Sequence, residues 1–213
     1  MKVSVSILSN TLKSQDIVKK INSSYIKPDF LHLDIMDGKF VKNKSWTFSE
    51  IKKIISYSNL PLDVHLMVSN PQKYIEDYAL LNTNDIIFHY EAVKDINQMI
   101  NLIKSYGLKV GISINPDTDV KVLFPYLNSI DLVLVMSVYP GSSGQEFISQ
   151  TTLKIKRLKE EILNNNYNVS ISVDGGINDE NAIFCKEAGA DIIVSASYIH
   201  KDISNNIDFL KKI

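Results

Sequence analysis

Two histidines and two aspartates stand near the ends of three short apolar segments of this chain. The segment HLDIMDGKF places His32 and Asp34 two residues apart, and in an extended strand such residues point to the same side. LDVHLM supplies His65 and ISVDGG supplies Asp174, each at the end of another apolar run. Because imidazole and carboxylate groups are ligands of divalent transition metals, the four residues predict a metal-dependent active site.

An alternation of strand-like and helix-like segments has to bring these residues together. Short β-branched runs alternate with longer segments whose apolar residues recur at helical spacing. The expected strands cover residues 3–7, 30–34, 62–67, 85–89, 109–114, 131–136, 169–173 and 191–194. The expected helices cover residues 11–22, 48–57, 71–81, 94–106, 118–126, 150–164, 178–188 and 203–212. Eight such pairs indicate a (β/α)8 barrel, the TIM barrel, built from residues 1–213 as a single domain.

The competing α/β architecture is an open, doubly wound sheet. That fold usually shows a GxGxxG turn after its first strand, whereas this chain reads ILSNTL there, so the barrel is favoured. In such barrels the active site lies at the carboxyl ends of the strands. His32, Asp34, His65 and Asp174 all fall at such ends, with Ser6 in the first strand. Burying these groups without partners would be costly, which favours a shared ion over four separate structural roles.

Three methionines occupy corresponding positions near strand ends. Met36 and Met67 follow the expected ligands of the second and third strands, and Met136 ends the sixth. Any one of them is explained by core packing. Together they predict an apolar, polarizable lid that restricts the access of water to the metal.

The chain contains one arginine, Arg157, which is expected in the middle of a helix and in solvent. A guanidinium grip on phosphate is therefore not expected, and backbone N–H groups at turns and helix starts are the alternative. Three turns offer such groups, at residues 139–147, 174–178 and 195–199. The last two follow the seventh and eighth strands, where barrel enzymes often bind phosphate.

Composition narrows the class of protein. The 213 residues are 45% apolar, which supports a large core. The net charge of −1 shows no excess of positive charge that would favour binding to nucleic acid or to an anionic membrane. The single cysteine, Cys185, excludes a disulfide framework and is expected to be a buried, inert thiol in a reducing compartment. No secretory signal is evident, and no apolar run approaches the roughly 18 residues of a membrane span. We expect a soluble, cytoplasmic protein that acts on a small molecule.

Six motifs between His32 and Ser197, together with Ser6, resemble the ribulose-phosphate 3-epimerase family in order and spacing. They are HLDIMDGKFV, LDVHLMVSNP, GISINPDT, VLVMSVYPGSSGQ, SVDGGI and AGADIIVSAS. The resemblance implies a (β/α)8 barrel of the ribulose-phosphate binding type. It also implies an isomerase of the pentose phosphate pathway that interconverts D-ribulose 5-phosphate and D-xylulose 5-phosphate. The implied cofactor is one divalent metal ion per chain, zinc, iron(II), manganese or cobalt, held by His32, Asp34, His65 and Asp174.

The resemblance also assigns roles in catalysis. Asp34 and Asp174 would be the two acid/base groups, because inversion at C3 removes a proton α to the carbonyl on one face and delivers one on the other. The implied substrate contacts are Ser6, His65, Gly141, Ser142, Ser143, Gly144, Gly175, Gly176, Ala196 and Ser197, joined by Met36, Met67 and Met136 from the argument above.

Several positions depart from the family pattern. The usual Asn-Pro-Gly-Phe-Gly-Gly is here Tyr139–Gly144, the usual Gly-Ser is Ala196–Ser197, and Lys42 replaces a proline in a loop expected to cover the site. Ala196 would be costly if its φ had to be positive. These changes leave a 3-epimerase of a hexulose 6-phosphate, such as D-allulose 6-phosphate, as an alternative. A catalytically silent phosphosugar-binding barrel is a further alternative, against which the complete set of metal and acid/base residues argues. The metal and any homo-oligomeric assembly stay open.

Overall fold

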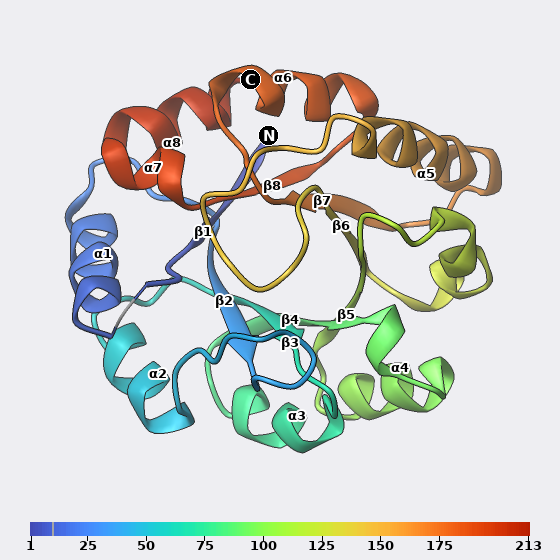
Figure 1. The fold of residues 1–213 in the computed structure, drawn as a ribbon, viewed down its shortest axis with the longest axis horizontal. Coiled ribbons are helices and arrows are strands. Elements are labelled where there is room, and N and C mark those ends of the chain that lie inside the picture. Colours follow the sequence, from blue (N-terminus) through green and yellow to red (C-terminus); the bar gives the residue numbers. More distant parts are fainter. Residues whose placement is uncertain (10) are drawn as a thin grey trace.

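The computed structural model is a closed ring of eight parallel strands surrounded by helices (Figure 1). It describes residues 1–9 and 11–213, without the side chains of Thr11 and Leu12. Strands follow one another around the barrel in chain order, and β1 pairs with β8 to close it. The strands are β1 (Lys2–Ser6), β2 (Phe30–Met36), β3 (Leu62–Met67), β4 (Thr83–His89), β5 (Lys109–Ile114), β6 (Leu132–Met136), β7 (Ser170–Asp174) and β8 (Ile192–Ser195).

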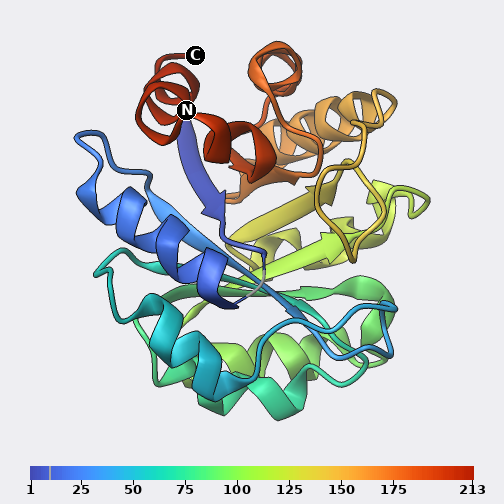
Figure 2. The same ribbon diagram turned by 60° about the vertical axis from the view of Figure 1, so that its left-hand side comes forward.

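Helices connect the strands on the outside of the barrel. The α-helices are α1 (Thr11–Ser23), α2 (Phe48–Ile55), α3 (Gln72–Ala79), α4 (Ile96–Ser105), α5 (Thr151–Asn165), α6 (Asp179–Ala188), α7 (Ser197–Lys201) and α8 (Ile203–Lys212). Two 3-10 helices, η1 (Tyr90–Ala92) and η2 (Val120–Ser129), complete the described elements. Both termini lie on the same side of the molecule (Figure 2), where the amino group of Met1 donates to the carbonyl of Lys211 at 3.1 Å.

Alternate residues of each strand face the helices or the barrel interior. Outward-facing residues such as Val3, Leu33 and Val173 join the main core with helix residues such as Leu158. The interior is apolar on the side of β6 and β8, where Leu132, Leu134, Met136, Ile192 and Val194 pack together. On the side of β1, β2 and β3 it is polar, and Ser4, Ser6, His32, Asp34, Asp63 and His65 are buried there. The barrel interior therefore has an apolar half and a polar half.

The (β/α)8 barrel predicted from the sequence is confirmed. The helix expected at residues 118–126 differs in type, because Val120–Ser129 forms a 3-10 helix with Pro125 inside it. Proline lacks the N–H that an α-helix needs at an interior position. The short helix α7 and the 3-10 helix η1 were not predicted, since elements this short carry no readable hydrophobic period.

Other expectations about single residues can be compared with the structure. Cys185 is fully buried, and burial raises the pKa of its thiol to about 12. The Arg157 side chain is half exposed and lies 3.6 Å from Asp119. Among the described residues, no helix is both long and apolar enough to cross a bilayer.

Candidate active site

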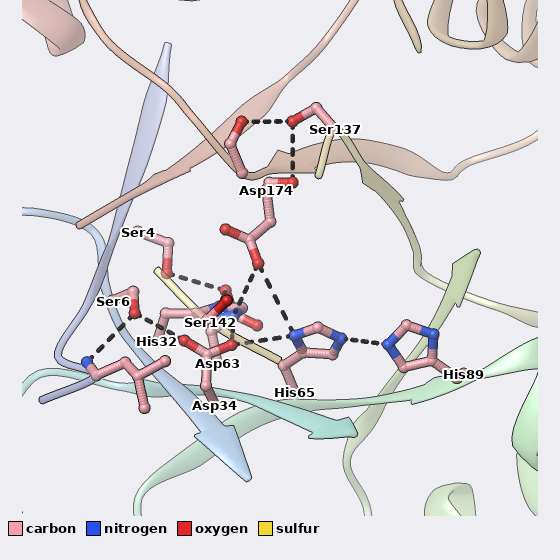
Figure 3. Close-up of polar contacts among 12 residues, drawn as sticks. Ser4, Ser6, His32, Asp34, Asp63, His65, His89, Ser137, Ser142 and Asp174 are labelled. Atoms are coloured by element: carbon pink, nitrogen blue, oxygen red, sulfur yellow. Dashed lines mark hydrogen bonds and ion pairs between the residues drawn. The ribbon is translucent and has the colours of Figure 1, made fainter. Parts of the chain in front are cut away.

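Side chains from three strands converge at the carboxyl end of the polar half of the barrel (Figure 3). Asp34 Oδ1 lies 3.2 Å from Nε2 of His32 and 3.2 Å from Nδ1 of His65. Oδ2 of Asp174 lies 3.9 Å from each of the same two nitrogens. One ligand atom from each of the four residues lies within 4.8 Å of the others. The structure therefore brings together the four residues for which the sequence predicted a shared ion.

The donor set fits a divalent transition metal. Metal–ligand bonds of about 2.0–2.2 Å for N and O donors place neighbouring ligands roughly 3–4 Å apart, which matches the separations around Asp34 and Asp174. Nε2 of His32 is buried and makes no aligned hydrogen bond despite its proximity to Asp34. A buried imidazole nitrogen that faces carboxylates without a hydrogen bond is an arrangement that a bound cation would satisfy.

Asp63 lies behind the four clustered residues and holds His32 in place. Its Oδ2 lies 2.8 Å from Nδ1 of His32 and also accepts the hydroxyl of Ser4 at 2.9 Å. This contact puts a proton on Nδ1 and directs Nε2 toward the cluster. Burial alone would lower the pKa of His32. The carboxylates of Asp63 and Asp34 outweigh this effect and raise the pKa well above its ordinary value. Metal binding would displace that extra proton.

A second buried carboxyl group, Asp85 of β4, lies beside Asp63. The two residues are register partners in adjacent strands, and Oδ1 of each carboxyl group is buried without a hydrogen-bond partner among the described residues. Burial, reinforced by the charge of Asp63, raises the pKa of Asp85 well above its ordinary value. This setting favours a proton on Asp85 and leaves the negative charge on Asp63, which contacts His32.

His65 is supported from its other ring nitrogen. Its Nε2 lies 2.8 Å from Nε2 of His89, and Nδ1 of His89 lies 3.3 Å from a carboxylate oxygen of Glu91. Both histidines are fully buried. Burial lowers the pKa of His65 to about 4, so its imidazole is neutral near neutral pH and can act as a metal ligand.

The two aspartates of the cluster have opposite electrostatic settings. Although burial opposes the shift, His32 and His65 hold the pKa of Asp34 far below its ordinary value. Burial and the nearby charge of Asp34 raise the pKa of Asp174 to about 7. Without a bound cation, one carboxyl group is thus ionised and the other is poised near neutral pH. Pairs whose pKa values are separated in this way are typical of acid/base catalysis.

Asp174 is positioned by the turn that follows β7. The hydroxyl of Ser137 donates to the carbonyls of Asp174 and Gly175 at 2.9 and 2.7 Å. Gly175 has a φ of 120°, and a Cβ there would lie 2.4 Å from Val138; Gly176 has a φ of 64°, and a Cβ there would lie 2.6 Å from the backbone nitrogen of Phe147. Any side chain would be strained at both positions, which explains the pair of glycines after the aspartate.

A cavity opens above the cluster, and most of the predicted site residues line it. These are Ser6, Asp34, Met36, Met67, Met136, Gly141, Ser142, Ser143, Gly144, Asp174, Gly175, Gly176, Ala196 and Ser197. His32 and His65 are fully buried below it. Leu8, Val138 and Val194 also line the cavity and were not predicted as site residues, whereas Gln145 and Ile177 lie in two of the turns predicted to bind an anion. The roles assigned to these residues stay predictions.

The methionines do not form one continuous lid. Met36 and Met67 pack with Val41 of the loop after β2, whereas Met136 packs with the apolar half of the barrel beside Val194. All three face the cavity from different sides. They thus form apolar walls around a polar floor, which limits the access of water from the sides.

Two loops meet above the cavity. Asn43 donates to the carbonyl of Gly141 at 2.8 Å, which joins the loop after β2 to the loop after β6. Asp37 organises the first loop by accepting from the backbone N–H groups of Lys39, Phe40 and Ser69. Gln145 organises the second loop by donating to the carbonyls of Tyr139 and Ser142 at 2.7 and 2.9 Å. The loop that carries Lys42 therefore lies against the rim of the site.

The backbone near β8 can present N–H groups to an anion. Ala196 has a φ of −115° and a ψ of −82°. Because this φ is negative, the cost that a positive φ would impose on alanine does not arise. Ser197 begins the short helix α7, and both residues line the cavity.

A second cavity adjoins the first and adds positive charge. It shares Gly141, Ser142, Ser143, Ala196 and Ser197 with the first cavity, and Lys13, Lys44 and Lys201 also line it. The sequence argument from the scarcity of arginine did not anticipate these lysines, because they come from three distant segments. The supporting residues Asp63, Asp85, His89, Glu91 and Ser137 were also missed.

The comparisons with known proteins agree with this geometry. A model described as "Ribulose-phosphate 3 epimerase family" matches residues 2–200. The chain belongs to this family. The ribulose-phosphate 3-epimerase of Helicobacter pylori (strain J99) is 40% identical over 199 residues, which are 93% of this chain and 90% of that protein. The enzyme of that name from Methanocaldococcus jannaschii is 41% identical over 200 residues, 93% of this chain and 84% of that protein.

The ribulose-phosphate 3-epimerases are isomerases, so the chain belongs to an isomerase family, as its motifs predicted. A solved structure of a 3-hexulose-6-phosphate synthase superposes with a TM-score of 0.73 and covers 100% of this chain and 99% of that one. At 14% identity this likeness shows the barrel fold alone. The family match and the buried group of histidines and aspartates thus support epimerase chemistry.

Proposed function

We propose that the protein interconverts D-ribulose 5-phosphate and D-xylulose 5-phosphate by proton transfer at C3. The observation that carries this proposal is the convergence of Asp34 and Asp174 on one cluster from β2 and β7. The two carboxylates reach the cluster from different sides of the barrel interior (Figure 3). Two acid/base groups on different sides of one carbon are what inversion of that carbon requires.

In the proposed reaction, Asp34 removes the C3 proton and Asp174 delivers a proton to the opposite face. The roles exchange in the reverse direction. The low pKa of Asp34 and the pKa of Asp174 near 7 give the pair one acceptor and one donor. Ser6, which donates to Asp34 at 2.7 Å, keeps that carboxylate oriented while its protonation state changes.

His32, Asp34, His65 and Asp174 would hold one divalent ion, such as zinc, iron(II), manganese or cobalt. When bound, such an ion supplies Lewis-acid stabilisation of the negative charge that develops on the substrate oxygens. The protein contributes the orientation of the ligands through Asp63, His89 and Ser6. The methionine walls exclude water, so the charge on the substrate is stabilised in a medium of low polarity.

The phosphate group of the ketose would lie between the loop after β6, the turn at Gly176 and the backbone of Ala196 and Ser197. These segments line the same cavity as the two aspartates. Backbone N–H groups in glycine-rich turns bind phosphate without a side-chain charge. Binding energy from the phosphate would then help to position C3.

The test is turnover in heavy water by the purified, metal-loaded protein. Each epimerisation should place solvent deuterium at C3 of the product, and removal of the metal with a chelator should abolish activity until the ion is restored. His65→Ala should lose the ion and the activity together. Full activity after exhaustive chelation, or product without deuterium, would contradict the proposal.

A second candidate substrate is a hexulose 6-phosphate such as D-allulose 6-phosphate. The observation that favours it is the adjoining cavity, which lengthens the site beyond Ser142 and Ser197. A ketose longer by one carbon could use this space without changing the chemistry at C3. Values of kcat/KM for the two substrates, measured side by side, decide between them.

A further inference from the structure

A chain of three side chains leads from the proposed metal site toward the surface. It starts at His65, continues through His89 and ends at Glu91, with contacts of 2.8 Å between the two Nε2 atoms and 3.3 Å from His89 Nδ1 to Glu91 Oε2 (Figure 3 draws the first contact). The two rings are inclined by only 28°. Each imidazole nitrogen can be a donor or an acceptor, so one proton position determines the next.

The outer end of the chain has a fixed polarity. Glu91 Oε1 accepts the backbone N–H of Asn115 at 2.9 Å and the hydroxyl of Thr118. Although burial opposes the shift, hydrogen bonds from His89, Thr118 and Asn115 lower the pKa of Glu91 to about 2. Glu91 is therefore a carboxylate at any pH near neutrality. Because a carboxylate can only accept, Nδ1 of His89 must carry a proton.

The inner end of the chain decides whether His65 can bind a metal. Nδ1 of His65 faces Asp34 at 3.2 Å and Asp174 at 3.9 Å, and without an ion it can donate to Asp34. It can bind a cation only when the ring proton lies on Nε2 instead. In that tautomer Nε2 of His65 donates to Nε2 of His89, whose own proton is then on Nδ1 and directed at Glu91.

We propose that Glu91 is a positioning residue that, acting through His89, fixes His65 in the tautomer whose Nδ1 is free to bind the metal. This inference rests on the proposed function, because it concerns the same metal site. Glu91 thus favours the metal-binding tautomer over the one in which Nδ1 donates to Asp34. The tautomer of His32 is set without an intermediate residue, because Asp63 contacts its Nδ1 directly. Phe40 covers His89, with ring centroids 4.7 Å apart, and shields the middle of the chain.

The substitution Glu91→Gln tests the direction of the proton chain. The backbone N–H of Asn115 can only donate, so it should retain the amide oxygen of the glutamine. The amide NH2 would then face His89 and donate to Nδ1. His89 would then carry its proton on Nε2 and donate it to Nε2 of His65, which leaves the proton of His65 on Nδ1, where it competes with the metal.

The first measurement is nitrogen NMR of protein labelled at the histidine rings. In the wild-type protein loaded with zinc, His89 should be protonated at Nδ1 and His65 at Nε2. In metal-free Glu91→Gln, His89 should be protonated at Nε2 and His65 at Nδ1. A zinc-loaded wild-type spectrum with the proton of His89 on Nε2 would overturn the proposal, and this result needs no variant that has to fold.

The second measurement is the affinity for cobalt(II), obtained by competition with a chromophoric chelator. Removal of outer partners of a metal-binding histidine typically weakens binding by about 10- to 100-fold, and we expect Glu91→Gln to fall in this range. Glu91→Asp keeps the carboxylate and should recover most of the affinity. Asp131→Asn is the matched control, because Asp131 also accepts a backbone N–H, from Val110 at 2.9 Å, but does not contact a histidine.

The outcomes separate this proposal from the proposed function. If Glu91→Gln binds cobalt(II) as tightly as Asp131→Asn, the proton chain does not position His65. If Glu91→Asp is as weak as Glu91→Gln, the loss comes from packing and the proposal also fails. Neither result touches the assignment of the metal site, which fails only if the wild-type protein binds no divalent ion.

Discussion

The hydroxyl of Ser6 donates a 2.7 Å hydrogen bond to Oδ2 of Asp34 and accepts the backbone N–H of Leu8 at 3.3 Å. The second contact fixes the hydroxyl so that its proton is committed to the carboxylate. With Oδ2 occupied, Oδ1 of Asp34 is the atom that faces both histidines. Ser6 therefore selects which oxygen of Asp34 is turned toward the proposed metal.

The substitution Ser6→Ala should lower kcat/KM while leaving the fold intact. A hydrogen bond to a charged group contributes about 1.5–3 kcal/mol, which corresponds to a loss of roughly 10- to 150-fold. Steady-state kinetics on the ketose phosphate measures this effect. Ser172→Ala is the matched control, because Ser172 is also a buried strand serine but its hydroxyl has no hydrogen-bond partner in the part of the chain that the structure describes. Equal kinetics for the two variants would contradict the role of Ser6.

The barrel could be predicted from the sequence because the patterns that indicate its strands and helices lie within short segments. A parallel strand buried on both faces reads as an apolar run, as LVLVM does in β6. The convergence of His32, Asp34, His65 and Asp174 then follows from the geometry of barrels, in which carboxyl ends of strands meet. Two local patterns and one architectural rule were sufficient for the position of the site.

The supporting residues could not be predicted in the same way. Asp85 touches Asp63 because β3 and β4 pair with a register shift near Leu62, and register is not readable from one strand. His89 and His65 are 24 positions apart, and only closure of the barrel interior brings their rings together. The lysines at the second cavity come from separate connections between elements. Contacts of this kind depend on tertiary structure, which no local pattern encodes.

The lysines at the second cavity should assist the capture of an anionic substrate. Lys44 and Lys201 line that cavity beside the proposed phosphate loops. Replacing both by methionine removes positive charge from the entrance, so KM should rise several-fold with little change in kcat. The difference from wild type should shrink as salt is added, because exposed charges are screened. Lys109→Met is the control, since Lys109 begins β5 and the cavities lie at the carboxyl ends of the strands. An increase in KM that is independent of salt would argue for a steric cause.

The setting of Asp85 leads to a prediction about the pH dependence of stability. Its folded-state pKa is raised by burial and by Asp63, so the folded protein binds a proton that the unfolded chain releases above about pH 4. The stabilisation is complete below that pH and declines as pH rises toward the folded-state pKa. Asp85→Asn keeps a donor toward Asp63 without the proton. In metal-free protein it should therefore be more stable than wild type near pH 7–8 and should lose this advantage near pH 4.

Urea unfolding of the metal-free protein across that pH range measures the difference directly. Asp131→Asn serves again as the comparison, because it removes a carboxylate that is not paired with another acid. A free energy of unfolding whose pH dependence is the same in wild type and Asp85→Asn would show that Asp85 is ionised in the folded protein.

The two aspartates of the proposed mechanism should show strong non-additivity. Asp34→Asn and Asp174→Asn each remove a proton acceptor while roughly keeping the shape of the side chain. Loss of a general acid or base commonly costs about 10²–10⁴ in rate, before any loss of metal is counted. Because both residues belong to the same four-residue cluster, the first substitution already removes most of what the second contributes.

The double variant should therefore be about as slow as the slower single variant. Rates are compared at saturating metal, and the bound ion is measured in each variant by elemental analysis. Losses that multiply would mean that the two carboxylates act independently, and near-wild-type epimerisation by Asp174→Asn with metal bound would exclude the two-aspartate mechanism. Exchange of the C3 proton without inversion in Asp174→Asn, by contrast, would identify Asp34 as sufficient for proton removal and Asp174 as the group that delivers the proton to the other face.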